Sequence, residues 1–423
     1  MVTSLQSALG CGYDELRVRG QKSDTSRLRV NFAGHSFITR MVVNAMPKTS
    51  YDTNPEVFNG AMDHVARSLQ SCLQDGFVDP QTGERYRIAI IAVKGDAPYL
   101  TKTGHFYRSY NTFAKRGQER GPPKGVCPYC LAGTSDFPAE DLVGCNPCWL
   151  PTVGVKLPWI RTPAFIRHLP HDRGNPTNMY KSDIWHVVHL GFGRSWIASV
   201  IQSTLPFLTQ PNLEEKWAYI SEDYMTWCRR NKKQCHISKI TPYLMSYGDA
   251  SGAMGNWHKG ALTCNFMQWL VDFLGKVPGD ADGLLLQFRQ ATYRMNAMFK
   301  TLYKAGAFLD ANEGSFVAEQ GLQFLQCYVT SAGTMFRRNK QFLFPLYPKL
   351  HIFHHQMLNI KFKCRDVGLC ESPMLFSCQM DEDTVGRASR LSRRVSIRLV
   401  AYRSLQRYLV CAHGAYVKAG LLG

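Results

Sequence analysis

Two Cys-x2-Cys pairs constrain the fold of this sequence more than any other feature. The first pair is Cys127 and Cys130, and the second is Cys145 and Cys148. Each pair can turn two thiolates toward one tetrahedral ion, and four thiolates are a common ligand set for structural zinc. The gap between the pairs is just shorter than the roughly 15–20 residues typical of such sites. The spacing therefore predicts a zinc knuckle over residues 127–149.

These cysteines have two other possible roles, a redox motif, which the sequence disfavours, and a different zinc site, which stays open. A redox role for a Cys-x2-Cys motif requires a thioredoxin-like context around a single pair, and this sequence has two pairs. A different zinc site, in which His171 or His186 joins Cys127 and Cys130, remains an alternative.

The composition indicates an intracellular globular protein. The chain has 423 residues, of which 45% are hydrophobic, enough for two or three structural units. Its N-terminus lacks a basic region followed by an apolar run, and no uncharged apolar stretch is long enough to span a bilayer. We therefore expect no membrane association, and expect most of the fourteen cysteines to be thiols or metal ligands rather than disulfides.

The charge favours a polyanionic partner. The formal net charge is +18 and is spread along the chain, which favours nucleic acid. Residues 104–125 mix cations with aromatic rings, a composition that suits phosphates and stacked bases, although a surface loop explains it equally well. Near the C-terminus, cations recur along one face of an expected helix, where they either contact phosphates or face solvent. The candidate nucleic-acid-binding residues are Arg108, Lys115, Arg116, Arg387, Arg390, Arg394 and Arg398.

A carboxylate follows an expected buried strand just before the knuckle. Residues 88–93 form a short β-branched run ended by Gly95, which predicts a strand, and Asp96 lies past its carboxyl end. Ligand-binding groups of open α/β sheets occupy this position. Residues 350–353 also predict a strand, and Lys181–Gly191 predicts a helix capped by Ser182 or Asp183.

Helical spacing dominates the rest of the chain. It predicts helices over Pro55–Leu73, Leu213–Arg230, His258–Leu274, Leu284–Tyr303 and Gly314–Phe336. We expect an α/β protein with an irregular segment at 1–30, the first part of the core at 31–126, the knuckle at 127–149, a Pro-rich connector and the start of a core helix at 150–189, an α-helical insertion at 190–340, and a last core strand with a basic helix at 341–423.

The order of several short motifs resembles one family. These are Lys94-Gly95-Asp96-Ala97-Pro98, the Cys-x2-Cys pair, Asp183-x2-His186, Pro348-Lys349-Leu350-His351 and the acidic start Asp381-Glu382-Asp383. In this order they are similar to segments of RNase H-like (DDE) cut-and-paste transposases, most closely the CACTA/CMC-type group and its relatives. The similar region covers residues 85–390.

The resemblance implies a fold and a chemistry. The fold would be an RNase H-like mixed sheet with a zinc knuckle and a large α-helical insertion. Asp96 and Glu382 would bind magnesium and cleave and transfer DNA strands, with His186 orienting the site. Two-metal phosphodiester chemistry needs a cluster of carboxylates. The first of the three is not identifiable, because Asp24 is poorly placed and Asn31 carries no charge.

The resemblance thus leads to two functional hypotheses. One is a transposon-derived nuclear protein that binds DNA and uses magnesium if it is active, with a homo-oligomer allowed. The other is a non-catalytic, zinc-stabilised nucleic-acid-binding or interaction protein. Convergence of Asp96 and Glu382 with a third carboxylate would favour the enzyme. A zinc-containing α/β protein of unrelated function is the remaining reading.

Overall fold

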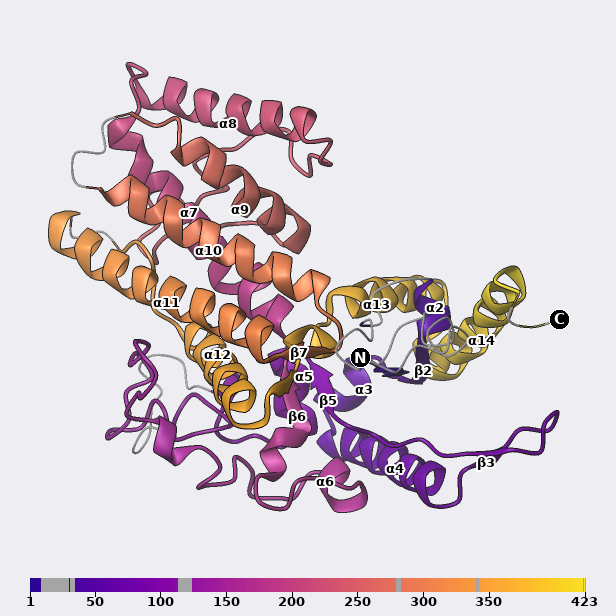
Figure 1. The fold of residues 1–423 in the computed structure, drawn as a ribbon. Coiled ribbons are helices and arrows are strands. Elements are labelled where there is room, and N and C mark those ends of the chain that lie inside the picture. The colour runs from indigo at the N-terminus through magenta and orange to yellow at the C-terminus, as the bar shows by residue number, and fades with distance from the viewer. Residues whose placement is uncertain are drawn as a thin grey trace. The chain divides into compact units, whose positions relative to one another are not determined.

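The computed structural model is a mixed α/β protein in which helices predominate (Figure 1). It describes residues 1–8, 30, 35–112, 124–278, 283–339, 342–420 and 422. Within these ranges the strands form four two-stranded sheets. The chain divides into two compact units. Unit 1 comprises Met1–Leu131, Thr152–Asp183 and Leu375–Gly423, and unit 2 comprises Ala132–Pro151 and Ile184–Met374. The expected α/β class is confirmed.

One part of unit 1 is a hairpin packed against the C-terminal helices. Strand β1 (Val2–Gln6) pairs antiparallel with β2 (Arg40–Ala45), which follows the short helix α2 (Ser36–Thr39). Phe37 and Val42 pack against Tyr408 and Ala412 of α14 (Val400–Lys418). The prediction of an irregular segment over residues 1–30 is wrong at β1. Asp24 and Asn31, considered for the missing carboxylate, lie outside the described residues.

The second part of unit 1 surrounds helix α4 (Pro55–Gln74), which confirms the predicted helix. Asn54 caps its first turn by accepting a hydrogen bond from the Glu56 N–H. The buried face of α4 contributes to a core that includes β5 (Val93–Gly95) and β6 (Tyr180–Ser182), which pair in parallel. The remaining elements are α3 (Thr49–Asp52), β3 (Phe77–Val78), β4 (Arg85–Tyr86), α5 (Ala97–Thr103) and α6 (Ala164–His168).

Two sequence predictions around this sheet need correction. The expected strand at 88–93 forms only at β5, because its partner β6 is three residues long and pairs with Val93, Lys94 and Gly95 alone. Lys181 does not begin a helix but lies in β6. The helix that follows spans Trp185–Phe192 with π-type hydrogen bonding and kinks at Gly191.

Unit 2 is largely a stack of helices (Figure 1). Neighbouring helices from α8 to α12 contact one another, and Trp196, Phe324, Tyr328 and Phe344 form part of their aromatic core. The four helices predicted there are confirmed to within about three residues at each end. The helices of the unit are α7 (Gly193–Thr204), α8 (Leu213–Arg230), α9 (Gly260–Leu274), α10 (Leu284–Lys304), α11 (Ala311–Asn339) and α12 (Pro348–Val367).

The strand predicted near residue 350 is instead part of α12. Pro348 begins the helix, where a missing N–H costs nothing, and Gly368 ends it with φ +77°. Its buried residues recur at helical spacing, as at Leu350, Phe353 and Met357. The only small sheet of this unit pairs β7 (Phe308–Asp310) with β8 (Leu369–Glu371), within the described residues. Unit 2 therefore continues past residue 340 to Met374.

Among the described residues, no helix combines the length and the apolar character needed to cross a membrane. The thirteen cysteines that fall within the described ranges are all free thiols.

Candidate metal centre and acidic site

The loop that carries Cys127 and Cys130 is held by a buried arginine. The Arg108 side chain donates from Nε to the Cys127 carbonyl at 2.8 Å and from Nη2 to the Lys156 carbonyl at 2.5 Å. The Tyr129 N–H donates to Cys127 Sγ at 3.3 Å. Arg108 is only 1% exposed, so its predicted role as a nucleic-acid-binding residue is wrong. Its guanidinium instead fixes the backbone of the Cys-x2-Cys loop.

Two histidines lie one turn apart on α12. Trp149 packs against both, with ring centroids 4.4 Å from His351 and 4.3 Å from His355. The intervening His354 donates from Nε2 to the Gly144 carbonyl, 2.9 Å away. Burial, the largest influence, lowers the pKa of His354 to about 4. His351 and His355 are thus presented on a rigid helix, which is how metal-binding imidazoles are commonly held.

Cys127, Cys130, His351 and His355 form a Cys2His2 cluster. Their sulfur and imidazole nitrogen atoms all lie within 4.8 Å of one another, three of the residues are buried, and His355 is half-buried. Two thiolates and two imidazoles are an established ligand set for tetrahedral zinc. The cluster could therefore bind a metal such as zinc. Within the described residues it is the only group of three or more candidate ligands this close together.

The ligand set differs from the predicted one in its second half. Cys145 and Cys148 lie outside the cluster. Cys145 Sγ is 2.9 Å from Lys361 Nζ, and Cys148 is exposed. Neither His171 nor His186 takes part. The sequence signal for the two histidines is their His-x3-His spacing, which puts two imidazoles on one helical face. It was missed because residues 350–353 were predicted to form a strand.

Two carboxylates follow the paired strands of unit 1. Gly95 of β5 and Ser182 of β6 are opposite each other in a parallel pair, so Asp96 and Asp183 follow at the same strand edge. Asp96 also caps α5, because its Oδ1 accepts a hydrogen bond from the Tyr99 N–H at 2.9 Å. Asp183 is 3% exposed. The prediction that Asp96 follows the strand is confirmed, whereas the sequence predicts Asp183 as a helix cap or as part of an Asp-x2-His motif.

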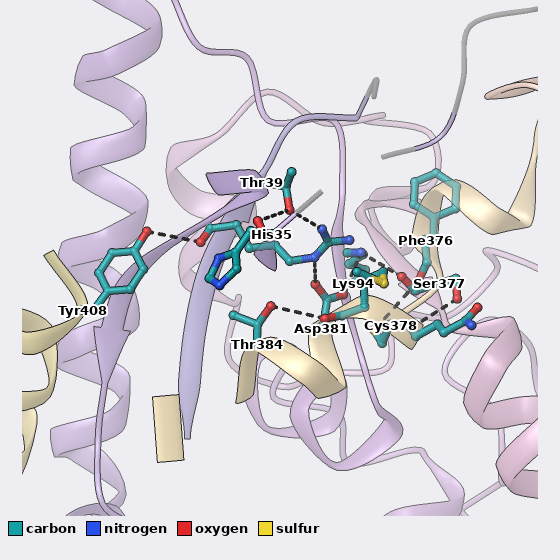
Figure 2. A network of polar contacts seen from close by, with 12 residues as sticks. His35, Thr39, Lys94, Phe376, Ser377, Cys378, Asp381, Thr384 and Tyr408 are labelled. Carbon is teal, nitrogen blue, oxygen red and sulfur yellow. Dashed lines mark hydrogen bonds and ion pairs between the residues drawn. The ribbon is translucent and has the colours of Figure 1, made fainter. Parts of the chain in front are cut away.

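The acidic start of α13 (Gln379–Leu391) presents Asp381 rather than Glu382 to the interior of unit 1. Figure 2 shows Asp381 beside Lys94, whose Nζ lies 2.8 Å from Asp381 Oδ2. The other oxygen, Oδ1, accepts a hydrogen bond from Arg40 Nε at 2.9 Å. Glu382 is exposed. The predicted magnesium-binding role of Glu382 stays a prediction.

The buried thiol of Cys378 is close enough to these acids to be influenced by their charges. Burial raises the pKa of the Cys378 thiol well above its usual value, and the negative charges of Asp183, Asp381 and Asp96 add to that effect, while Lys94 opposes it. Three carboxylates thus act on one buried sulfur. Their oxygens nevertheless do not gather within metal-binding distance as a group of three, at least among the described residues.

His186 belongs to the π-helical turn at the start of a segment of unit 2. Its carbonyl accepts a hydrogen bond from Lys349 Nζ at 2.8 Å, so this main-chain contact joins two of the sequence motifs. The predicted role of His186 in orienting the site stays a prediction.

The C-terminal basic residues lie on two helices rather than one. Arg387 and Arg390 belong to α13, which ends at Leu391, and Arg394 has a left-handed backbone with φ +59°. Arg398 is in the turn before α14. The single basic face predicted for these four residues is therefore broken at the turn. Lys115 and Arg116 lie outside the described residues.

No family model, curated protein or solved structure matches this chain.

Proposed function

We propose that this is a zinc-stabilised, DNA-binding protein of the DDE transposase type, acting in the nucleus. The observation that carries the proposal is the charge of the C-terminal segment of unit 1. From residue 384 to the end of the chain there are eight arginines and lysines and no aspartate or glutamate. Seven of these eight side chains are exposed, and Arg387 is half-buried.

A surface of one sign suits the phosphate backbone of a nucleic acid. Each phosphate neutralised by a cation releases condensed counterions, so binding weakens steeply as salt increases. Exposed arginines on a helix pair can contact successive phosphates without reading the bases. The choice of DNA over RNA, and the relation to a transposable element, rest on the resemblance of the motif order.

Zinc in the Cys2His2 cluster would serve structure rather than chemistry. Two protein thiolates and two imidazoles complete a tetrahedral shell and leave no position for water or substrate. The donor set fits this role, since the cluster is mostly buried and Arg108 braces its Cys-x2-Cys loop.

The test is the salt dependence of DNA binding by a charge variant and a matched control. In the variant, Arg390, Arg394 and Arg398 are changed to Gln. In the control, Lys232, Lys233 and Lys239, three exposed lysines of unit 2, are changed to Gln. Both lose three charges.

We expect the slope of log K against log salt to become shallower by about 2–3 in the arginine variant and to change little in the control. Equal changes in the two variants would mean that only net charge matters, and unchanged binding in the arginine variant would contradict the proposed surface.

Magnesium-dependent strand cleavage is a second candidate function. It is favoured by the position of Asp96 and Asp183 at one strand edge. It is disfavoured by Asp381, whose two oxygens are already engaged by Lys94 and Arg40. The measurement is nicking of supercoiled DNA with magnesium by wild type and by Asp96→Asn. Cleavage that disappears in the variant would establish the enzyme, and no cleavage by wild type would leave the DNA-binding function alone.

A further inference from the structure

We propose that a groove in unit 1 binds an extended peptide of a partner protein by strand addition, independently of any DNA binding. The groove has a volume of about 470 Å³. Along one side it is lined by residues of β1, from Thr3 to Gln6, and along another by residues 87–94, which lead into β5. Two stretches of strand or strand-like chain thus border one cavity.

Both stretches have main-chain groups that no neighbouring strand uses within the described residues. There, β1 pairs only with β2, on one of its two edges. In the other stretch the Ile88 N–H bonds to the Cys72 carbonyl, and strand pairing begins only at Val93. Unpaired edges of this kind are templates for an added strand, since each N–H and C=O gains a hydrogen bond.

The side chains of residues 87–92 indicate the same partner geometry. Exposure alternates along the segment, with Arg87, Ala89 and Ile91 exposed and the residues between them half-buried. This two-residue period is that of a β-strand. Ile91 is 62% exposed, although the sequence around it is the β-branched apolar run of a buried strand. A strand-forming sequence that lacks a neighbour is thus left partly open to solvent.

The charged residues that line the groove indicate which residues the ligand should have at its two ends. Arg87 and Lys94 lie at opposite ends of the segment, and no aspartate or glutamate lines the groove. The complementary ligand is an extended peptide with apolar residues at alternate positions and an acidic residue at each end. A five-residue strand opposite residues 88–92 would be about 17 Å long.

Peptide binding tests the proposal with purified full-length protein. The probe is a fluorescent seven-residue peptide that alternates valine and threonine between two glutamates, and binding is followed by fluorescence anisotropy. One comparison peptide replaces the glutamates with lysines. A second carries N-methyl groups at alternate residues, which remove strand hydrogen bonds while keeping the side chains.

We expect the glutamate peptide to bind at least tenfold more tightly than either comparison peptide. Ile91→Asp should weaken binding at least tenfold, whereas Ile160→Asp should not, because Ile160 is 90% exposed and does not line the groove. Arg87→Glu should reverse the preference toward the lysine peptide.

Failure of the glutamate peptide to bind wild type would overturn the proposal. So would equal binding of the N-methylated peptide, which would show that strand hydrogen bonds are not used. The isoleucine variants change only exposed side chains, so their folding is checked by thermal melting. DNA binding plays no part in these measurements, and its presence or absence does not affect their outcome.

Discussion

Lys94 Nζ lies 2.8 Å from Asp381 Oδ2, an ion pair that joins the end of β5 to the first turn of α13. Arg40, whose side chain is fully buried, approaches the other carboxylate oxygen at 2.9 Å. Asp381 therefore connects the hairpin, the parallel strand pair and the C-terminal helices within unit 1. The Tyr408 hydroxyl adds a hydrogen bond to the Arg40 carbonyl at 3.3 Å (Figure 2).

Removing the carboxylate of Asp381 should be costly. Asp381→Asn removes the carboxylate that pairs with the buried Arg40 side chain, and breaking a buried pair in this way costs about 3–5 kcal/mol. We expect the lower end of that range, about 3 kcal/mol, because the Asp381 side chain is 20% exposed. The free energy of unfolding is measured by urea titration followed by circular dichroism.

Asp383→Asn is the matched control on the same helix. Asp383 pairs with Arg387 four residues on, and both side chains are more than one third exposed. Exposed pairs of this kind contribute about 0.3–0.5 kcal/mol. Similar losses in the two variants would show that the Asp381 pair is no more than a surface contact.

Metal content distinguishes the Cys2His2 cluster from the four-cysteine knuckle. Native mass spectrometry should find one zinc per chain in wild type, and Cys127→Ser and His355→Ala should each lose it because a tetrahedral site needs all four ligands. Cys145→Ser should keep its zinc. The opposite pattern, with zinc lost in Cys145→Ser and kept in His355→Ala, would restore the four-cysteine site.

Close packing of α11 against α12 should make one glycine irreplaceable. A Cβ at Gly321 would overlap the buried Met357 side chain, including its Cγ at 2.7 Å. Gly321→Ala should therefore destabilise the protein by about 1–3 kcal/mol, as overpacking does. At Gly333 on the same helix a Cβ would meet nothing closer than the Arg337 side chain at 3.4 Å.

Gly333→Ala is accordingly expected to stabilise the protein by up to about 1 kcal/mol, the difference in helix propensity. Thermal unfolding of the two variants beside wild type measures both effects. If Gly321→Ala were as stable as Gly333→Ala, the two helices would have room to move apart.

Acid should destabilise unit 2 through His189. This imidazole is stacked on Trp185 and meets the edge of Phe299, and burial lowers its pKa to about 3. In the unfolded chain its pKa is near 6.5, so below that pH the unfolded state binds a proton that the folded state excludes. The contribution of neutral His189 to the free energy of unfolding is complete above pH 6.5. It falls by about 1.4 kcal/mol per pH unit between pH 6.5 and pH 3.

His189→Phe keeps an aromatic ring and removes the titration. Between pH 6.5 and 5 the wild type should therefore lose about 2 kcal/mol more than the variant, measured by urea unfolding at each pH. Because the comparison uses the pH dependence of each protein, a constant loss of stability in the variant does not matter. Identical pH dependence would mean that the folded protein admits the proton.

Local patterns in the sequence determined most of the helical structure. Leu213–Arg230 forms α8 at the predicted bounds, because a long amphipathic repeat with an Asn cap specifies a helix by itself. Asp96 follows its strand for a similar reason, since a β-branched run ended by glycine specifies a local turn. Cys127 and Cys130 pair in one site because two residues between cysteines bring the thiolates together.

Tertiary structure alone decided which distant groups meet. Whether Cys145 or His355 completes the cluster depends on contacts between segments more than 200 residues apart, about which local spacing carries no information. Residues 350–353 by themselves resemble a strand, because four residues are too few to show the helical spacing of the buried residues along α12. Residues 88–92 have a strand-forming sequence, but a strand exists only where a neighbour supplies its hydrogen bonds, and β6 reaches no further than Val93.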